Sequence, residues 1–386
     1  GILYVKKETW LSLFFVALLG GGLVWSLLTP DREYSESENR YLQTLPRPDA
    51  DQIFSGKFGS QFESYITDQF PARDGWVALK TITQLGLGRP DNGRVYFGEK
   101  DRLFAVPEEA DEAWEERNCR AVAAFLRRAK ENRPSLRASV LLAPTASTVL
   151  PEDLPALAPV ADEEALFDRM RAALEGVALF YTPAQALKAQ SDRESLYFRT
   201  DHHWTVRGAY VAYAGWADAV GLEARPLADF TAREAAGDFY GTLFSKANLP
   251  WIRPDSLEAL EPPGLAACSF STDGGKTFSD GLYDEEALKG RDKYTYFLGG
   301  NHPLTVVRTG TANGRRLLVV KDSYAHSFVP FLTEHYETIY LLDPRYFKGD
   351  IQSWMEEQAV TDVLVLYNAA TFSADRQLAA VLQPRT

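Results

Sequence analysis

Short apolar strands alternate with amphipathic helices along two stretches of the chain, and this alternation restricts the possible folds more than any other feature. In the first stretch, strands are predicted at residues 138–142 and 177–181, and helices at 112–132, 163–174, 183–190 and 206–220. In the second, strands are predicted at 316–320, 338–342 and 363–367, and helices at 324–335, 351–357 and 374–382. Parallel strands need long crossover connections, which are usually helices. The pattern therefore predicts an α/β fold in which helices flank a parallel sheet.

Residues 223–313 interrupt this alternation. They contain several prolines and many glycine and aspartate residues, and no strong helical pattern. We interpret them as a β-rich segment inserted into a single domain that spans residues 51–386. The chain has 386 residues, 45% of them hydrophobic, which is enough for a sizeable core.

Residues 10–28 carry no charge, and nineteen such residues can span a bilayer as a helix. Lys6 and Lys7 precede this run and acidic residues follow it, so the positive-inside rule places the N-terminus in the cytoplasm. The predicted organisation is a tail and anchor at 1–29, a linker at 30–50 and an extracytoplasmic domain. The alternative is a cleaved signal peptide. It is disfavoured because the run exceeds the usual apolar region of about 7–15 residues and no Ala-x-Ala-like site follows.

Glycines 20–22 lie inside this apolar run. Glycine weakens a helix, but it also allows a second helix to approach closely in a membrane. Two interpretations stay open, namely that the bilayer tolerates these glycines or that they form a contact face for a membrane partner.

Residues 54–85 read as helical, with an interruption at Pro71. Their apolar side chains recur at helical spacing, which predicts faces turned toward the core. The residues concerned are Phe58, Phe62, Tyr65, Ile66, Trp76, Leu79 and Ile82. Residues 94–104 alternate around a polar turn, which predicts a β-hairpin.

Composition narrows the classes of function. The formal net charge is −12 and no basic stripe is visible, which argues against nucleic acid. A polysaccharide stays compatible, because aromatic faces and hydrogen bonds can hold it. The two cysteines, Cys119 and Cys268, are too few for a disulfide scaffold or a cysteine-based metal site, and we expect two unpaired buried thiols.

The motif Asp-His-His-Trp at residues 201–204 concentrates catalytic residue types. On an extended segment alternate side chains share one side, so Asp201 and His203 would project together. An acidic neighbour orients and polarises an imidazole for general-base catalysis. His202 would then be a neighbour or a structural hydrogen-bond donor, and Trp204 is expected to pack under the loop rather than stack on a sugar.

Ser323 is the predicted nucleophile. It follows the apolar run 317–320 and precedes helix-like sequence, so it should lie at the carboxyl end of a strand, where ligands bind in open α/β sheets. The alternative is that Ser323 only caps the following helix. We hypothesise that Asp201, His203 and Ser323 converge as a triad.

A metal site is the competing chemistry for the motif, because aspartate and histidine are common ligands. It would need further ligands, and His302, His326 and His335 are isolated in the sequence, without His-x-x-x-His or Cys-x-x-Cys spacing. We therefore expect no metal site. No nucleotide-binding glycine-rich loop is present either, and we expect no bound cofactor.

The Asp-His-His-Trp motif resembles the signature of the bacterial DHHW protein family. The chain is also similar to the alginate O-acetylation proteins, relatives of the SGNH hydrolases in which the Asp/His pair precedes the serine. Further family-like stretches lie at residues 35–40, 68–74, 95–98, 241–243, 321–324 and 343–346. The resemblance runs from about residue 35 to residue 370, nearly the whole chain.

The resemblance implies a membrane-anchored SGNH-like O-acetyltransferase at the bacterial cell surface, with His203 as the general base. It implies transfer of an acetyl or other short acyl group to a cell-surface polysaccharide through an acyl-serine. The acyl donor would come from a partner, a polytopic membrane-bound O-acyltransferase. Such enzymes build the oxyanion hole with an asparagine. Asn368 is the best positional match and Asn301 competes, although neither lies in a Gly-x-Asn-Asp motif.

Tyr324, Arg345 and Tyr346 follow strand ends and could line the pocket. Arginine can pair with a substrate carboxylate, although a surface salt bridge explains Arg345 almost as well. Two other functions stay open. One is a carbohydrate esterase with the same triad, and the other is a non-catalytic glycan-binding or assembly subunit.

Overall fold

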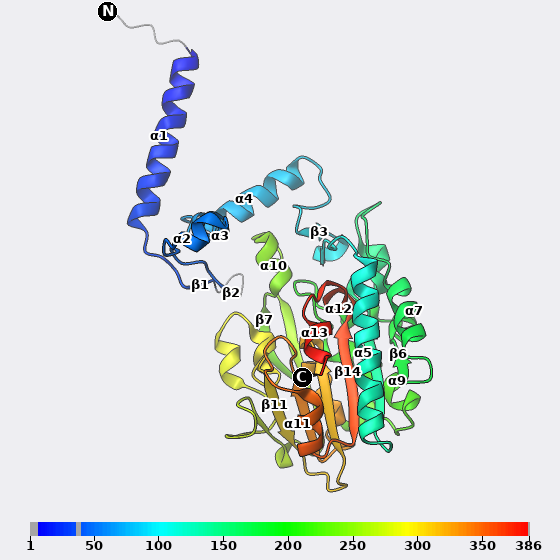
Figure 1. Ribbon diagram of the computed structural model, residues 1–386. Helices are drawn as coiled ribbons and strands as arrows, with labels where there is room; N and C mark the ends of the chain where they lie inside the picture. The colour runs from blue at the N-terminus through cyan, green and yellow to red at the C-terminus, as the bar shows by residue number, and fades with distance from the viewer. Residues whose placement is uncertain (1–6, 36–39, 385–386) are drawn as a thin grey trace, which may run out of the picture.

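The computed structural model describes residues 7–35 and 40–384. Lys6, which flanks the predicted anchor, lies outside the described residues. So do residues 36–39, which belong to the predicted linker and to the family-like stretch at 35–40. Helix α1 (Lys7–Leu28) stands apart from the rest of the molecule (Figure 1). Its segment Thr9–Leu28 is long and apolar enough to cross a membrane, and none of it is buried inside the protein. The helix therefore suits a signal or an anchor.

Three helices follow: α2 (Ala50–Phe54), α3 (Lys57–Asp68) and α4 (Arg73–Gly86). The break predicted at Pro71 lies between α3 and α4. Most of the apolar side chains that were predicted to face the core in these helices are exposed instead. Phe62, Ile66, Trp76, Leu79 and Ile82 are 41–52% exposed, so that prediction is wrong. The helical period was correct, but no element of the described chain covers these faces.

An eight-stranded sheet forms the centre, in the order β10-β9-β11-β13-β12-β14-β5-β6. The five strands from β13 to β6 are parallel, which confirms the predicted α/β fold. These strands are β5 (Arg137–Ala143), β6 (Leu179–Tyr181), β12 (Arg316–Lys321), β13 (Thr338–Leu342) and β14 (Asp362–Asn368). Strand β12 reads as continuously apolar because it lies inside the sheet with both faces covered.

Alternate residues of the central strands enter two different cores. On one face, Leu317 and Val319 pack with Trp216 of α9 (Val206–Ala219). On the other, Leu318 and Val320 join the cluster that holds α5 (Glu112–Asn132). That second layer also contains α7 (Glu163–Ala173), α11 (Ile351–Glu357), α12 (Ala369–Ala374) and α13 (Leu378–Leu382). The shorter helices are α6 (Ala146–Val149), α8 (Ala184–Lys188) and α10 (Thr242–Ala247).

The 223–313 segment is β-rich, as predicted, and part of it completes the central sheet. Strands β9 (Ser269–Ser271), β10 (Ser279–Asp280) and β11 (Leu304–Arg308) add an antiparallel edge beside β13. Strands β7 (Thr231–Phe239) and β8 (Asp255–Glu261) form a separate antiparallel ribbon. This antiparallel edge makes the sheet mixed and not purely parallel. The sequence did not predict the edge because its strands are too short to give a clear pattern. The remaining pairs are β1 (Tyr34–Ser35) with β2 (Arg40–Tyr41), and the predicted hairpin, β3 (Val95–Phe97) with β4 (Leu103–Ala105).

Two other predictions differ from the structure. The helix predicted at 324–335 is instead a pair of 3-10 helices, η8 (Ser323–Ser327) and η9 (Val329–Leu332), with Pro330 in the second. Proline cannot donate the backbone hydrogen bond that a continuing α-helix needs. The helix predicted at 374–382 is divided between α12 and α13. Cys119 and Cys268 are free and buried, as expected.

Candidate active site

The motif at 201–204 lies in a short loop that is closed by backbone pairing with residues 197–198. An isolated bridge pairs Tyr197 with Trp204, and the Phe198 amide donates to the His203 carbonyl at 3.3 Å. The Trp204 indole is fully buried, as the packing interpretation predicted. Its Nε1 donates to the Tyr324 carbonyl at 3.1 Å and to Ser327 Oγ at 3.0 Å. The loop is thus fastened to the turn that follows strand β12.

Ser323 begins that turn, at the carboxyl end of β12. Its hydroxyl Oγ lies 2.7 Å from His203 Nε2. On the opposite side of the imidazole, His203 Nδ1 lies 3.1 Å from each carboxylate oxygen of Asp201. A proton on Nδ1 satisfies Asp201 and leaves Nε2 free to accept the Ser323 O–H. The structure therefore brings the three predicted residues into one hydrogen-bonded chain.

The electrostatics of the pair favour a neutral imidazole beside an ionised carboxylate. Burial lowers the pKa of His203 to about 4; His202 adds to the decrease, and Asp201 opposes it. Burial alone would raise the pKa of Asp201, but the imidazoles of His203 and His202 and their hydrogen bonds bring it below its ordinary value. The backbone amide of His202 also donates to Asp201 at 3.0 Å. A neutral, oriented imidazole is the form that a general base requires.

Two residues of the 223–313 segment fix the backbone that carries Asp201. The Asp255 carboxylate accepts from the backbone amides of Arg199, at 3.1 Å, and Thr200, at 2.8 Å. It also accepts the Thr200 hydroxyl at 2.6 Å. Gly241 lies so close that a Cβ there would come within 2.1 Å of the Asp201 Cβ. Asp255 gave no sequence signal, while Gly241 belongs to a family-like stretch.

Tyr294, from the same segment, covers the face of the imidazole. Its ring stacks on that of His203 with centroids 3.7 Å apart and an interplanar angle of 11°. Its hydroxyl donates to the Ser323 carbonyl at 2.9 Å and lies 3.3 Å from Ser327 Oγ. One buried side chain therefore contacts both the candidate base and the backbone of the candidate nucleophile. No spacing in the sequence pointed to it.

Asp322, not Ser323, caps the turn. The Asp322 side chain accepts from the Tyr324 amide at 2.9 Å and from the Asn368 amide at 2.7 Å. Capping alone therefore does not explain Ser323, whose hydroxyl points to His203. The expected α-helix N-terminus behind the serine is absent, because the turn is the 3-10 helix η8. An α-helix N-terminus, whose free N–H groups could stabilise an oxyanion, is therefore not available to Ser323.

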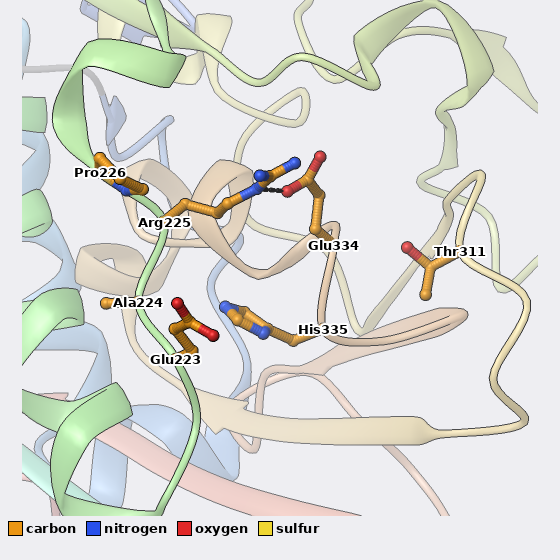
Figure 2. Close-up of a pocket in the computed structure, with 7 residues that line it drawn as sticks. All are labelled: Glu223, Ala224, Arg225, Pro226, Thr311, Glu334 and His335. Atoms are coloured by element: carbon orange, nitrogen blue, oxygen red, sulfur yellow. Dashed lines mark ion pairs between the residues drawn. The ribbon is translucent and has the colours of Figure 1, made fainter.

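Ser323 and His203 open into a cavity of about 220 Å³. Its other lining residues include His202, Thr242, Arg291, Tyr294, Asn301 and Arg345. His202 Nδ1 lies 2.7 Å from Thr242 Oγ1. A larger hollow of about 500 Å³ lies elsewhere, beside the ion pair of Arg225 and Glu334 (Figure 2). It contains none of the three hydrogen-bonded residues.

The two asparagine candidates lie in different environments. Asn301 is exposed and lines the cavity, and its Oδ1 accepts from Lys321 Nζ at 3.0 Å. Asn368 is buried outside the cavity lining. Its Oδ1 accepts from the Ala370 amide at 3.0 Å, and its Nδ2 reaches the Ala143 carbonyl at 3.4 Å. The structure thus favours Asn301 over Asn368, because Asn368 already caps helix α12.

Of the remaining candidates, Arg345 lines the cavity, whereas Tyr324 and Tyr346 do not. Arg345 lines the cavity, but Asp343 holds its guanidinium through contacts of 2.9 and 2.7 Å. Tyr324 is buried, and its hydroxyl donates to the His202 carbonyl at 2.5 Å. Tyr346 is half exposed and lies against Arg345, outside the cavity lining. Tyr324 therefore supports the motif loop from below rather than lining the pocket.

The metal hypothesis has three candidate ligands here, since single ligand atoms of Asp201, His202 and His203 lie within 4.8 Å of one another. The Asp201 oxygens already accept from His203, and His203 Nε2 already accepts from Ser323. A metal ion would have to displace this chain of hydrogen bonds. The donor set therefore fits proton transfer better than metal binding.

Comparison with known proteins agrees with the fold. Residues 179–342 match the DHHW protein family. A DHHW family protein from Eubacterium siraeum superposes with a TM-score of 0.62 at 22% identity, covering 75% of this chain and 97% of that one. Bacillus cereus PatB1 with a sulfonyl adduct superposes with a TM-score of 0.61 at 19% identity, covering 75% and 99%. The resemblance to the DHHW family is confirmed for residues 179–342.

The O-acetyltransferase domain of Pseudomonas putida AlgJ is more distant. Its TM-score is 0.48 at 16% identity, with 75% of this chain and 98% of that chain covered. No curated protein matches the sequence significantly.

The lowered pKa of His203 predicts how Ser323 should respond to pH. A serine-directed sulfonyl or phosphonate reagent should modify Ser323 at a constant rate from pH 8 to pH 6. Because burial lowers the pKa from its ordinary 6.5, the neutral base persists in this range, and the rate should decline only as the pH approaches about 4. Half-maximal modification at pH 6.5 or above would contradict the assigned environment of His203.

Tyr294 should act as a positioning residue for the same reaction. Tyr294→Phe keeps the stacking and loses the contacts of the hydroxyl with the Ser323 carbonyl and Ser327 Oγ, so modification of Ser323 should slow roughly fivefold. Tyr294→Leu also uncovers the imidazole, and its acid limb should move upward toward pH 6.5 as His203 regains solvent. If both variants only lowered the thermal midpoint and left the pH profile in place, Tyr294 would be a packing residue alone.

Proposed function

We propose that this chain is an extracytoplasmic O-acyltransferase that transfers an acetyl or similar short acyl group to a polysaccharide hydroxyl. The hydrogen-bonded chain Asp201–His203–Ser323 carries the proposal. A partly buried serine hydroxyl held by a neutral imidazole, itself held by a carboxylate, is the arrangement for acyl transfer through serine. The similarity to DHHW proteins supports the fold on which this arrangement rests.

The proposed reaction has two halves. Ser323 Oγ forms a bond to the carbonyl carbon of the acyl donor while His203 Nε2 accepts the serine proton. The imidazolium then returns that proton to the leaving group, and an acyl-serine remains. In the second half, a sugar hydroxyl gives its proton to His203 and attacks the acyl carbon, and Ser323 regains a proton as its bond to the acyl group breaks. Asp201 holds the tautomer and stabilises the imidazolium in both halves.

Asn301 is the proposed side-chain donor to the oxyanion. Lys321 Nζ can only donate hydrogen bonds, so its contact with Asn301 Oδ1 fixes which end of the amide faces the lysine. The amide NH₂ group is then turned away from Lys321, on a residue that lines the cavity with Ser323. Lys321 is buried and also contacts His326 Nε2 at 2.8 Å and Asp343 at 3.4 Å. This network would hold Asn301 ready before an acyl group arrives.

The donor and the location follow from the anchor and the family resemblance. We infer that α1 is an uncleaved single-pass anchor that keeps the domain outside the cytoplasm. An acyl donor made in the cytoplasm must then cross the bilayer, so we propose a polytopic membrane-bound O-acyltransferase as the partner and no bound cofactor. Alginate O-acetylation proteins, which the chain resembles, suggest a polysaccharide acceptor.

Covalent labelling tests the nucleophile. The PatB1 structure carries a sulfonyl adduct, which makes a sulfonyl reagent a suitable probe. Treatment of the full-length protein should add one sulfonyl group, found by peptide mass spectrometry at Ser323. Ser323→Ala should lose the label, and His203→Ala should slow it by at least a hundredfold, since the general base is missing. Ser353→Ala is the control, because Ser353 is exposed in helix α11 and lies outside the cavity lining, and this variant should label like the wild type. Undiminished labelling of Ser323→Ala would refute the assignment.

An assay with and without added polysaccharide distinguishes acyl transfer to a sugar from hydrolysis by water. Membranes containing the full-length protein should move a radiolabelled acyl group from a p-nitrophenyl ester to an added polysaccharide, and Ser323→Ala should abolish this transfer. A transferase predicts more product on the glycan than free acid when glycan is present. Free acid alone, unchanged by added glycan, would identify a carbohydrate esterase. Unaltered polymer acylation in cells carrying Ala at 201, 203 and 323 would indicate a non-catalytic subunit.

A further inference from the structure

Exposed large apolar side chains outside α1 are concentrated in one short part of the chain. Among the described residues, eleven of them lie between residues 41 and 87, and five lie in all of residues 88–384. The eleven are Tyr41, Leu45, Ile53, Phe54, Phe62, Ile66, Phe70, Trp76, Leu79, Ile82 and Leu87. Exposed apolar side chains gathered in this way point to an interaction site.

Helix α4 packs Leu85 against a buried cluster of the globular domain, but it carries other large apolar side chains on the side turned away from that domain. Thr81 is fully buried, and its hydroxyl accepts from the Asn92 side chain at 3.0 Å. Asn92 in turn donates to the Lys246 carbonyl in α10 at 2.9 Å. Leu79 precedes Thr81 by two positions, which places it about 200° around the helix, on the opposite side. Trp76 lies one turn before Leu79, on the same outward side.

Helix α3 is arranged in the same way. Asp68 is buried and accepts from the Gln43 amide at 2.8 Å, so this side of α3 faces the protein. Ile66 lies two positions earlier, and Phe62 lies one turn before Ile66. Both apolar residues therefore point away from the protein. A helix of a soluble domain normally shows the reverse, with its apolar side inward. We name the outward residues Phe62, Ile66, Trp76 and Leu79 the α3–α4 face.

Hydrogen bonds tie α3 to the end of α1. Tyr65 donates through its hydroxyl to Asp31 at 3.1 Å. Gln69 holds the backbone of Arg32 on both sides, accepting from its amide at 2.8 Å and donating to its carbonyl at 2.9 Å. Asp31 and Arg32 follow Leu28, the last residue of the candidate membrane span, by only three and four positions. If α1 spans a bilayer, α3 is therefore held at the bilayer surface.

We propose that the α3–α4 face lies in the interface of the lipid bilayer that α1 enters. The proposal rests on the anchor role of α1. Tryptophan and phenylalanine suit the headgroup level, and amphipathic helices lie there with their apolar side about 5–10 Å deep. Residues 50–88 contain three basic and four acidic residues, Lys57, Arg73 and Lys80 against Asp51, Glu63, Asp68 and Asp74. The contact should therefore depend on apolar burial and not on anionic headgroups.

This contact would set the height of the cavity above the membrane. Helix α4 packs against α10, and α10 begins at Thr242, which lines the cavity beside His202. Helices α4 and α10 thus connect the α3–α4 face to the candidate active site. Ser323 would be kept within reach of an acyl donor delivered at the membrane surface, in place of moving freely on the linker.

Spin labels on the full-length protein in phosphatidylcholine vesicles test the proposal. Labels at Ile66→Cys and Leu79→Cys report the face, and Leu18→Cys reports α1. Ser64→Cys is the matched control, because Ser64 is exposed and lies about 200° from both Phe62 and Ile66 on the same helix. Cys119 and Cys268 are buried, so unsubstituted protein gives the background labelling.

The labels at 18, 66 and 79 should be several-fold more accessible to oxygen than to a water-soluble nickel complex, and the label at 64 should show the reverse. Adding anionic lipid should change these ratios less than twofold. Nickel accessibility at 66 and 79 equal to that at 64, with the label at 18 still in lipid, would overturn the proposal and leave the anchor intact. Labels at 66 and 79 shielded from both reagents would show a protein partner instead, which also overturns it. A label at 18 in water would overturn the anchor and this contact together.

Discussion

A buried carboxylate must be satisfied by hydrogen-bond donors, and the arrangement of the whole site depends on how this chain satisfies Asp201. The donors are His203 Nδ1, at 3.1 Å, the amide of His202, at 3.0 Å, and more distantly the Thr242 hydroxyl, at 3.5 Å. Once Asp201 takes the proton-bearing side of the imidazole, the other ring nitrogen is left to accept from Ser323. Asp255 and Gly241 hold the loop in this position. The geometry of proton transfer is therefore a consequence of how one buried charge is accommodated.

The 223–313 segment has a larger part in this site than its irregular sequence suggests. It supplies Asp255 behind the loop, Tyr294 over the imidazole and Asn301 in the cavity, and its strands β9 to β11 extend the sheet that carries Ser323. The parallel half of the sheet presents the nucleophile, and the inserted segment encloses it. Burial of His203 follows from this enclosure, and so does its lowered pKa.

Local patterns in the sequence predicted those parts of the molecule that local physics decides. Strands 138–142 and 363–367 are apolar because both sheet faces are covered, and two-residue periodicity placed Asp201 and His203 on one side. Tyr294 and Asp255 escaped prediction because their roles depend on contacts between distant segments. The α-helix predicted after Ser323 was wrong because Pro330 cannot donate the backbone hydrogen bond that a continuous helix needs there. The outward faces of α3 and α4 showed the expected helical period, which cannot distinguish a protein core from a bilayer.

The proposed chemistry requires that His203 accepts from Ser323 while it donates to Asp201. Nitrogen-15 NMR of histidine-labelled protein measures this most directly, since the chain has five histidines and a His203→Gln variant assigns the signals. At pH 7 we expect a proton on Nδ1 of His203 and an unprotonated Nε2 whose resonance moves in Ser323→Ala, whereas Asp201→Asn should perturb Nδ1. A proton found on Nε2, or an Nε2 resonance indifferent to the loss of the Ser323 hydroxyl, would contradict it.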